Sequence, residues 1–98
     1  MPEAYRVTLT PGALADLDRL DRFLREKNPS AADRMLAAFD MAFTRLSENP
    51  FDCPAISGMG LRARVVRFGK GGYVCLYAVR GESVVVVRLF HAREDWRP

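Results

Sequence analysis

The spacing of apolar residues predicts two amphipathic helices in the first half of the chain. The first covers residues 13–27, and its leucines recur three or four positions apart, at Leu14, Leu17, Leu20 and Leu24. The second covers residues 30–49, with apolar positions at the same steps: Ala32, Met35, Leu36, Phe39, Ala42, Phe43 and Leu46. Asn28 and Pro29 separate the two patterns, and so short a break predicts a helical hairpin whose apolar stripes share one surface.

Alternating or continuous apolar residues predict four strands around this hairpin. A short, half-buried strand at residues 5–9 precedes it. After a loop at residues 51–60, three more strands are expected at residues 61–68, 73–80 and 83–90. Their short, glycine-rich connections predict an antiparallel meander. The last strand contains four consecutive valines, so it is expected to be central and covered on part of both faces.

This order of elements, β-α-α-β-β-β, predicts an α+β domain in which the helical hairpin packs on one side of a twisted antiparallel sheet. The 98 residues make a single domain, residues 1–98, with a composition typical of a soluble globular protein. No apolar run approaches the ~20 residues that span a bilayer, and the run of valines at residues 84–87 ends at Arg88. Because the N-terminus also resembles no secretory signal, we expect a cytoplasmic protein that does not contact the membrane.

The composition offers little metal-binding or catalytic chemistry. Cys53, Cys75 and His91 are the only residues of their kinds, too few to build a zinc site, so no metal and no cofactor are expected and the two cysteines are interpreted as reduced thiols. The glycines that follow Gly69 lead into a strand, whereas a phosphate-binding loop leads into a helix. The net charge of +3 is compatible with an acidic or nucleic-acid partner without requiring one.

Arginines alternate with apolar residues along the strand at residues 61–68. Arg62 and Arg64 are expected on one face of the sheet. The residues of the other phase are Leu61, Ala63 and Val65. Arg67 falls out of this phase, which predicts a bulge or a strand end near Val66.

These arginines define a candidate basic face. Its members are Arg62, Arg64, Arg67 and Arg88, with Arg93 just beyond the last strand. If that face of the sheet is open, the cluster is suited to phosphate or to acidic side chains. The alternative is an ordinary solvated strand face.

The segment after the valine-rich strand holds the most varied side chains of the chain. His91 is in phase with Val85, Val87 and Leu89, so we expect it to face the core, more readily as a hydrogen-bonding residue than as a catalyst. Trp96 either covers an edge of the core or contacts a partner.

Several segments, in their order and spacing, resemble the RelE/ParE toxin superfamily over nearly the whole chain. They read ALADLDRLDRFL, NPSAADRM, LSENP, YVCLY and VVVVRLFHAREDW, and the last resembles the closing segment of the ParE-like branch. The resemblance implies the same fold and a bacterial type II toxin, held inactive by a cognate antitoxin, ParD-like or similar, encoded beside it. RelE-like members cleave mRNA in the ribosomal A site, whereas ParE-like members poison DNA gyrase.

The resemblance also helps to choose between these targets. RelE-like nucleases carry an arginine where this chain has Val74, lysines where it has Val65 and Arg67, and a tyrosine near the C-terminus, which is absent here. Only Arg67 and Arg93 match. Cleavage by the 2′-hydroxyl needs a base, a phosphate-stabilising cation and an acid together. The resemblance therefore favours the ParE-like branch, with no catalytic residue, no sequence-specific nucleic-acid binding, and DNA gyrase as the target.

On this interpretation the candidate target-binding residues are His91, Arg93 and Trp96, held at the end of a rigid strand. The C-terminal segment of the antitoxin, disordered alone, is expected to fold over the chain and meet the basic face. Two alternatives remain: a ribosome-dependent mRNA endonuclease, and a toxin-fold protein that has lost activity and only binds its partner.

Overall fold

The computed structural model describes residues 4–56 and 58–94, and it contains two helices and five strands. In chain order they are β1 (Arg6–Leu9), α1 (Pro11–Lys27), α2 (Pro29–Glu48), β2 (Ala55–Ile56), β3 (Leu61–Phe68), β4 (Gly71–Arg80) and β5 (Ser83–His91). Thr10 and Asn28 cap the two helices through their side-chain oxygens, and a proline follows each cap. Within the described residues, neither helix is long and apolar enough to cross a membrane.

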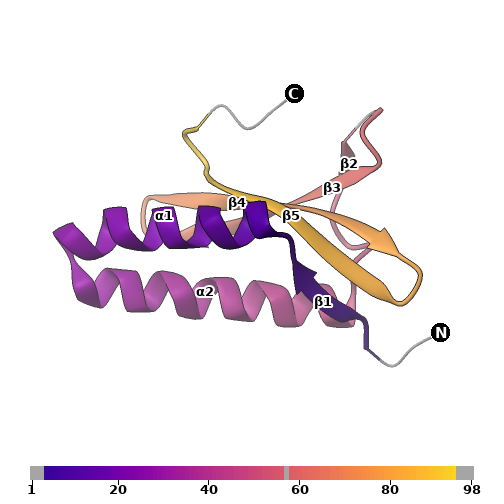
Figure 1. The fold of residues 1–98 in the computed structure, drawn as a ribbon, viewed down its shortest axis with the longest axis horizontal. Helices are drawn as coiled ribbons and strands as arrows, with labels where there is room; N and C mark the ends of the chain where they lie inside the picture. Colours follow the sequence, from indigo (N-terminus) through magenta and orange to yellow (C-terminus); the bar gives the residue numbers. More distant parts are fainter. Residues whose placement is uncertain (1–3, 57, 95–98) are drawn as a thin grey trace.

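The helical hairpin covers one face of the sheet, as predicted, and this confirms the α+β class (Figure 1). The strand order is β1-β5-β4-β3-β2, and β3, β4 and β5 form the expected antiparallel meander. One point of the prediction is wrong: β1 pairs with β5 in parallel, so the sheet is mixed. Both helices stand between β1 and the meander in the chain, and a connection of this length can join strands that run in parallel. The alternation of apolar residues does not indicate strand direction, so the sequence pattern could not predict this pairing.

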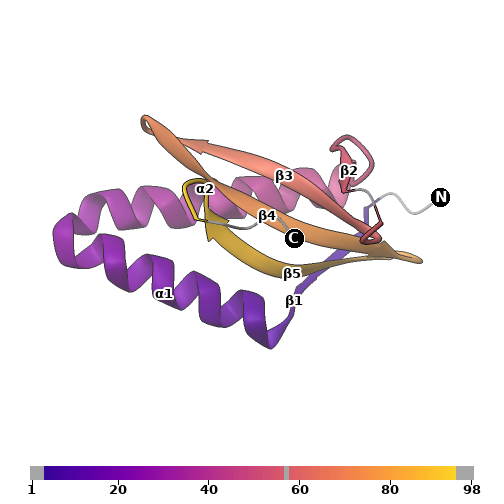
Figure 2. The same ribbon diagram turned by 90° about the horizontal axis from the view of Figure 1, so that it is seen from above.

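The main core lies between the hairpin and the sheet. Met35, Phe39 and Leu46 of α2 are buried in it against Tyr77 and Leu89 of the sheet, so the predicted stripe of α2 is confirmed at these positions. The two helices lie side by side along this layer, as Figure 2 shows from above. The larger of the two clusters of buried apolar residues is in this layer, and its burial holds the sheet in a fixed position for the residues at its ends.

The predicted stripe of α1 is wrong at its first position. Leu14 is 55% exposed, whereas Ala13, Asp16 and Leu20 are the buried residues of this helix. The stripe in contact with the core is therefore rotated from the line of leucines. Phe43 of α2 is likewise only partly buried at the border of the core.

A bulge in β5 changes the predicted alternation. The register with β4 skips Val87. Val86 faces the core before the bulge, and Leu89 and His91 face it afterwards. The prediction that His91 faces the core is confirmed, but grouping Val85 and Val87 with it is wrong, because the extra residue reverses the phase.

Three smaller points concern the strands. β3 pairs with β4 in regular register as far as Phe68, so the predicted irregularity near Val66 is absent. β5 lies between β4 and β1 and packs on both faces, so the prediction of a central strand is confirmed; the middle strand of the five is β4, which is buried from Gly72 to Ala78. The short strand β2, within the predicted loop, pairs with the start of β3.

Candidate functional site

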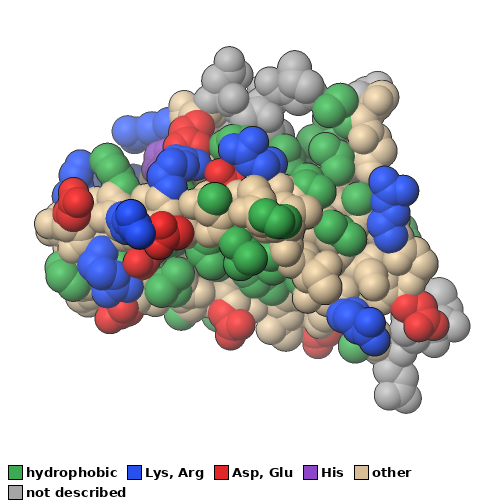
Figure 3. Space-filling view, in the orientation of Figure 1, with side chains coloured by type: hydrophobic (Ala, Val, Ile, Leu, Met, Phe, Trp, Pro, Cys, Tyr) green, Lys and Arg blue, Asp and Glu red, His purple; other side chains and the backbone are tan. Residues whose placement is uncertain are grey.

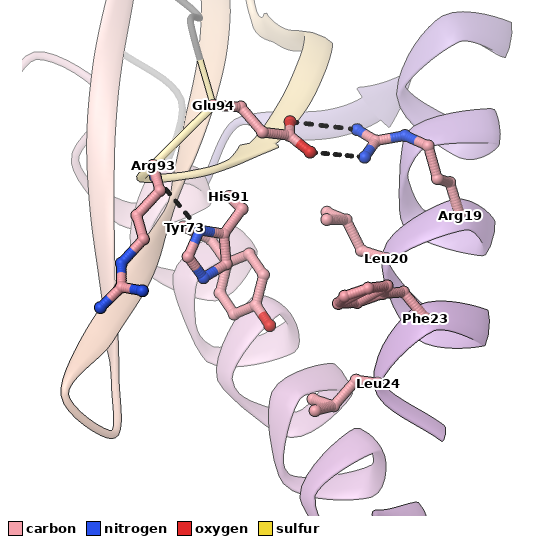
Figure 4. A pocket seen from close by; sticks show the side chains of 8 residues that line it. All are labelled: Arg19, Leu20, Phe23, Leu24, Tyr73, His91, Arg93 and Glu94. Carbon is pink, nitrogen blue, oxygen red and sulfur yellow. Dashed lines mark hydrogen bonds and ion pairs between the residues drawn. The ribbon is translucent and has the colours of Figure 1, made fainter. Parts of the chain in front are cut away.

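A groove of about 640 Å³ separates α1 from the ends of β4 and β5; we call it the α1–β5 groove (Figure 4). Its helical wall consists of Arg19, Leu20, Phe23 and Leu24. Its opposite wall consists of Tyr73, His91, Arg93 and Glu94. The groove is therefore lined by apolar and aromatic side chains, with charged groups at its rim, a pattern common in binding sites.

An ion pair closes one end of the groove. Arg19 donates to both carboxylate oxygens of Glu94, with Nη1–Oε1 at 2.6 Å and Nη2–Oε2 at 3.3 Å. The hydrogen bond to Glu94 raises the pKa of Arg19 above its usual value. The pair ties the segment after β5 to the middle of α1.

His91 and Tyr73 lie side by side on the wall of the groove opposite α1. Their rings meet edge to face with centroids 5.4 Å apart, and His91 Nδ1 accepts a hydrogen bond from the Arg93 backbone N–H at 3.1 Å. In a neutral imidazole the proton is then on Nε2. Burial raises the pKa of Tyr73, so its hydroxyl stays protonated. Neither side chain is placed here as a general base.

Asp16 is the residue at this site that sequence reasoning missed. β1 pairs with β5 only as far as Val86, and beyond it the Asp16 carboxylate accepts the backbone N–H of Leu89 at 2.9 Å. Arg88 binds the same carboxylate through Nε at 2.7 Å and Nη2 at 3.0 Å. Asp16 thus caps the open edge of β5 and fixes the start of the C-terminal segment against α1.

The electrostatics of Asp16 follow from these contacts. Burial alone would raise its pKa, but the hydrogen bonds from Arg88 and Leu89 and the charges of Arg88 and Arg19 outweigh burial, so the pKa lies below its ordinary value. The sequence contains a usable signal: Asp16 stands three positions after Ala13 and four before Leu20, on the buried stripe of α1.

The four arginines of the predicted basic face do not form one surface. Arg62 and Arg64 do share a face of β3, but it is the face that the helices cover: Arg62 donates to the Cys53 carbonyl at 2.6 Å, and Arg64 contacts its Sγ at 3.4 Å. Arg67 is exposed. Arg88 lies across β4 and pairs with Asp16. The idea of a single open cluster is therefore wrong, because strand phase and sheet position separate its members.

The other candidates are placed as follows. His91 and Arg93 both line the α1–β5 groove, together with α1, whereas Trp96 lies outside the described residues.

Both cysteines are free, and burial raises the pKa of the Cys75 thiol to about 12, which leaves it protonated. Among residues 4–56 and 58–94, no group of three or more His, Cys, Asp and Glu side chains is arranged to hold a metal ion.

Chains from two solved toxin–antitoxin structures share this architecture. A chain of the chromosomal ParDE toxin–antitoxin system from P. aeruginosa superposes with a TM-score of 0.75 at 16% identity, covering 94% of this chain and 100% of that one. A chain of the toxin–antitoxin complex RelBE2 from Mycobacterium tuberculosis superposes with a TM-score of 0.64 at 25% identity, covering 96% and 98%. The fold is thus that of the RelE/ParE superfamily.

Sequence comparison places the chain within this superfamily. The family described as ParE toxin of the type II toxin–antitoxin system parDE matches residues 7–96, so the chain belongs to that family. Two curated relatives from Caulobacter vibrioides are Toxin RelE3, 37% identical over 90 residues (90% of this chain, 95% of that one), and Toxin RelE1, 32% identical over 91 residues (93% and 97%).

Proposed function

We propose that this toxin acts by binding DNA gyrase and that a cognate antitoxin neutralises it. Membership of the ParE toxin family supports the first part. The solved structures that share the fold come from a ParDE system and a RelBE2 toxin–antitoxin complex, which supports the second. Function then lies in protein recognition, with no bond made or broken by this chain.

The observation that favours gyrase over mRNA is the environment of Val74. RelE-like nucleases carry an arginine at this position, and here Val74 is buried with Ala63 and Leu76 on the sheet face away from the helices. The two arginines that do match the nuclease pattern, Arg67 and Arg93, line different hollows of the surface. The positions that match the nuclease pattern are therefore not brought together at one place among the described residues, although such a reaction needs its groups at one site.

A nuclease is the second candidate, because the two curated relatives carry the name RelE and the α1–β5 groove contains tyrosine, histidine and arginine side chains. The surroundings of His91 and Tyr73 oppose it. His91 Nδ1 is already engaged, and buried Tyr73 holds its proton. A ribosome-dependent cleavage assay with purified protein separates this candidate from gyrase poisoning.

Expression without the antitoxin should produce filamentous cells with DNA breaks and a damage response, because a poisoned gyrase leaves cleaved DNA. Co-expression of the neighbouring reading frame should restore growth.

Arg93→Ala should lower toxicity without changing the thermal midpoint, since Arg93 lies in the proposed target-binding segment. Arg80→Ala, at the far end of β4, is the matched control. A-site cleavage of mRNA with gyrase supercoiling unaffected would contradict the gyrase proposal, and absence of any toxicity would favour a binding protein that has lost activity.

Arg67, the exposed arginine of β3, can be used to test whether the antitoxin presents acidic side chains to this protein. Arg67→Glu should slow association with the antitoxin by about 2- to 10-fold at low salt and by less at high salt, because charges at the rim of an interface act mainly on encounter. Arg80→Glu is the control, since Arg80 is also an exposed strand arginine. Stopped-flow association rates measure the effect, and equal rates for both variants would remove Arg67 from the interface. Arg62 and Arg64 are less suitable, because both contact Cys53.

A further inference from the structure

The α1–β5 groove presents an apolar surface that the described chain leaves open. Phe23 is 61% exposed, although it lines the groove beside Leu20 and Leu24. Lys27 lies over its ring, with Nζ 3.8 Å from the centroid. An aromatic ring that is exposed on one wall of a groove is a typical anchor position for a partner side chain.

The charged groups of the groove favour an acidic partner. Arg19 and Arg93 line it, and Lys27 stands beside it, while Glu94 is the single carboxylate among its described lining residues. Figure 3 shows basic and acidic side chains interspersed over the end of the molecule where α1 lies, so the preference for an acidic partner rests on the lining of the groove itself. Cations around an apolar floor complement a segment that carries both apolar and acidic side chains.

Arg19 is held in place independently of Glu94. Its Nη2 lies 3.6 Å from the buried Asp16 carboxylate, which Arg88 and the β5 backbone fix in turn. The Arg19–Glu94 pair itself is at the surface, with side chains 47% and 35% exposed. Exposed pairs contribute little to stability, so Glu94 is replaceable while Asp16 keeps the guanidinium oriented toward the groove.

We propose that an acidic, apolar segment of the antitoxin occupies the α1–β5 groove and that one of its carboxylates replaces Glu94 on Arg19. This proposal rests on the antitoxin partner proposed above. The apolar side chains of the segment pack on Phe23 and Leu24, and its carboxylate takes the position of Glu94 at the rim. The exchange breaks one ion pair and forms one, so the net charge buried at the rim is unchanged.

The exchange has a consequence for the target-binding segment. Glu94 follows directly on His91 and Arg93, and its bond to Arg19 ties this segment to α1. An antitoxin carboxylate on Arg19 releases that tie, and the antitoxin backbone then covers His91 and Arg93 in the groove. Neutralisation therefore follows from occupying the groove, since the same side chains face the antitoxin and the target.

Matched pairs of exposed α1 variants test the groove. The protein is separated from the co-expressed product of the adjacent reading frame, refolded, and titrated with that product by calorimetry. We expect Arg19→Glu to weaken binding about tenfold or more and Arg22→Glu, whose described partner is Asp18, to change it by less than about twofold. Phe23→Ala should weaken binding about tenfold, whereas Leu14→Ala, on the same helix outside the groove, should not. Thermal midpoints show that each variant is folded.

Glu94→Gln should change the affinity for the antitoxin in the opposite direction. Removing the internal competitor should tighten binding about 2- to 5-fold, with the gain fading at high salt, whereas a purely structural role of Glu94 predicts weaker or unchanged binding. Wild-type affinity in folded Arg19→Glu and Phe23→Ala would place the antitoxin elsewhere and leave the proposed function intact. Loss of toxicity in these variants with normal antitoxin binding would assign the groove to the target. If the neighbouring product does not bind the wild-type chain, both the partner and this docking site are wrong.

Discussion

Replacing Leu46 with alanine should lower the free energy of unfolding by about 2–5 kcal/mol, a large share of the stability of a small domain. Leu46 is fully buried near the end of α2, within the core formed by the hairpin and the sheet. The loss combines the transfer of its methyl groups to water with the cavity left behind, which a close-packed core fills only partly. Urea unfolding followed by circular dichroism measures it.

Met41→Ala is the matched control for this change. Met41 lies on the same helix but is 62% exposed, so its truncation should alter the free energy of unfolding by no more than about 0.5 kcal/mol. If the two variants unfold at the same urea concentration, α2 does not pack on the sheet through the face that contains Leu46.

The helices could be read from the sequence because their signals are local. Thr10 with Pro11, and Asn28 with Pro29, mark both starts, and the structure places the caps at these residues. The apolar residues of α2 recur at helical spacing with little interruption, so its buried face followed directly. The family resemblance, carried by the order of several short segments, was confirmed by the match over residues 7–96.

What the sequence did not predict depends on contacts between distant segments. The direction of β1 is set by its pairing with β5, and the bulge at Val87 by the register between β4 and β5. The basic face failed for the same reason: Arg88 has the charge and spacing of a surface residue, but its partner, Asp16, is 72 positions away in the chain. Side chains of one charge on neighbouring strands form one surface only when strand phase and sheet order agree.

One wall of the α1–β5 groove could be predicted from the sequence, and the other could not. His91 and Arg93 were identified from the sequence as candidate target-binding residues, and the structure places them on one wall. The opposite wall could not be anticipated, because α1 was interpreted only through its leucines. Phe23 lies off the leucine stripe, and Asp16 is an aspartate like the more exposed Asp18 and Asp21 of the same helix.

Replacing Asp16 with asparagine should lower the free energy of unfolding by about 2–4 kcal/mol at neutral pH, because it removes the charge that binds Arg88 and weakens the acceptor of the buried Leu89 N–H. The folded-state pKa of Asp16 lies below its ordinary value, so its contribution is present in full above the unfolded-state value and is lost as the pH falls through the folded-state value. The difference between wild type and variant should therefore shrink below about pH 4.

Asp18→Asn is the control, since Asp18 is an exposed acid on the same helix whose described partner is Arg22, and it should change stability by no more than about 0.5 kcal/mol. Urea unfolding at several pH values measures both variants. A difference between wild type and Asp16→Asn that stays constant from neutral to acid pH would mean that shape and packing, rather than the carboxylate charge, hold β5 against α1. A difference that fades in acid, together with unchanged stability of Asp18→Asn, would identify the Asp16 carboxylate as the group that fixes this end of the sheet and, through Arg19, the rim of the groove.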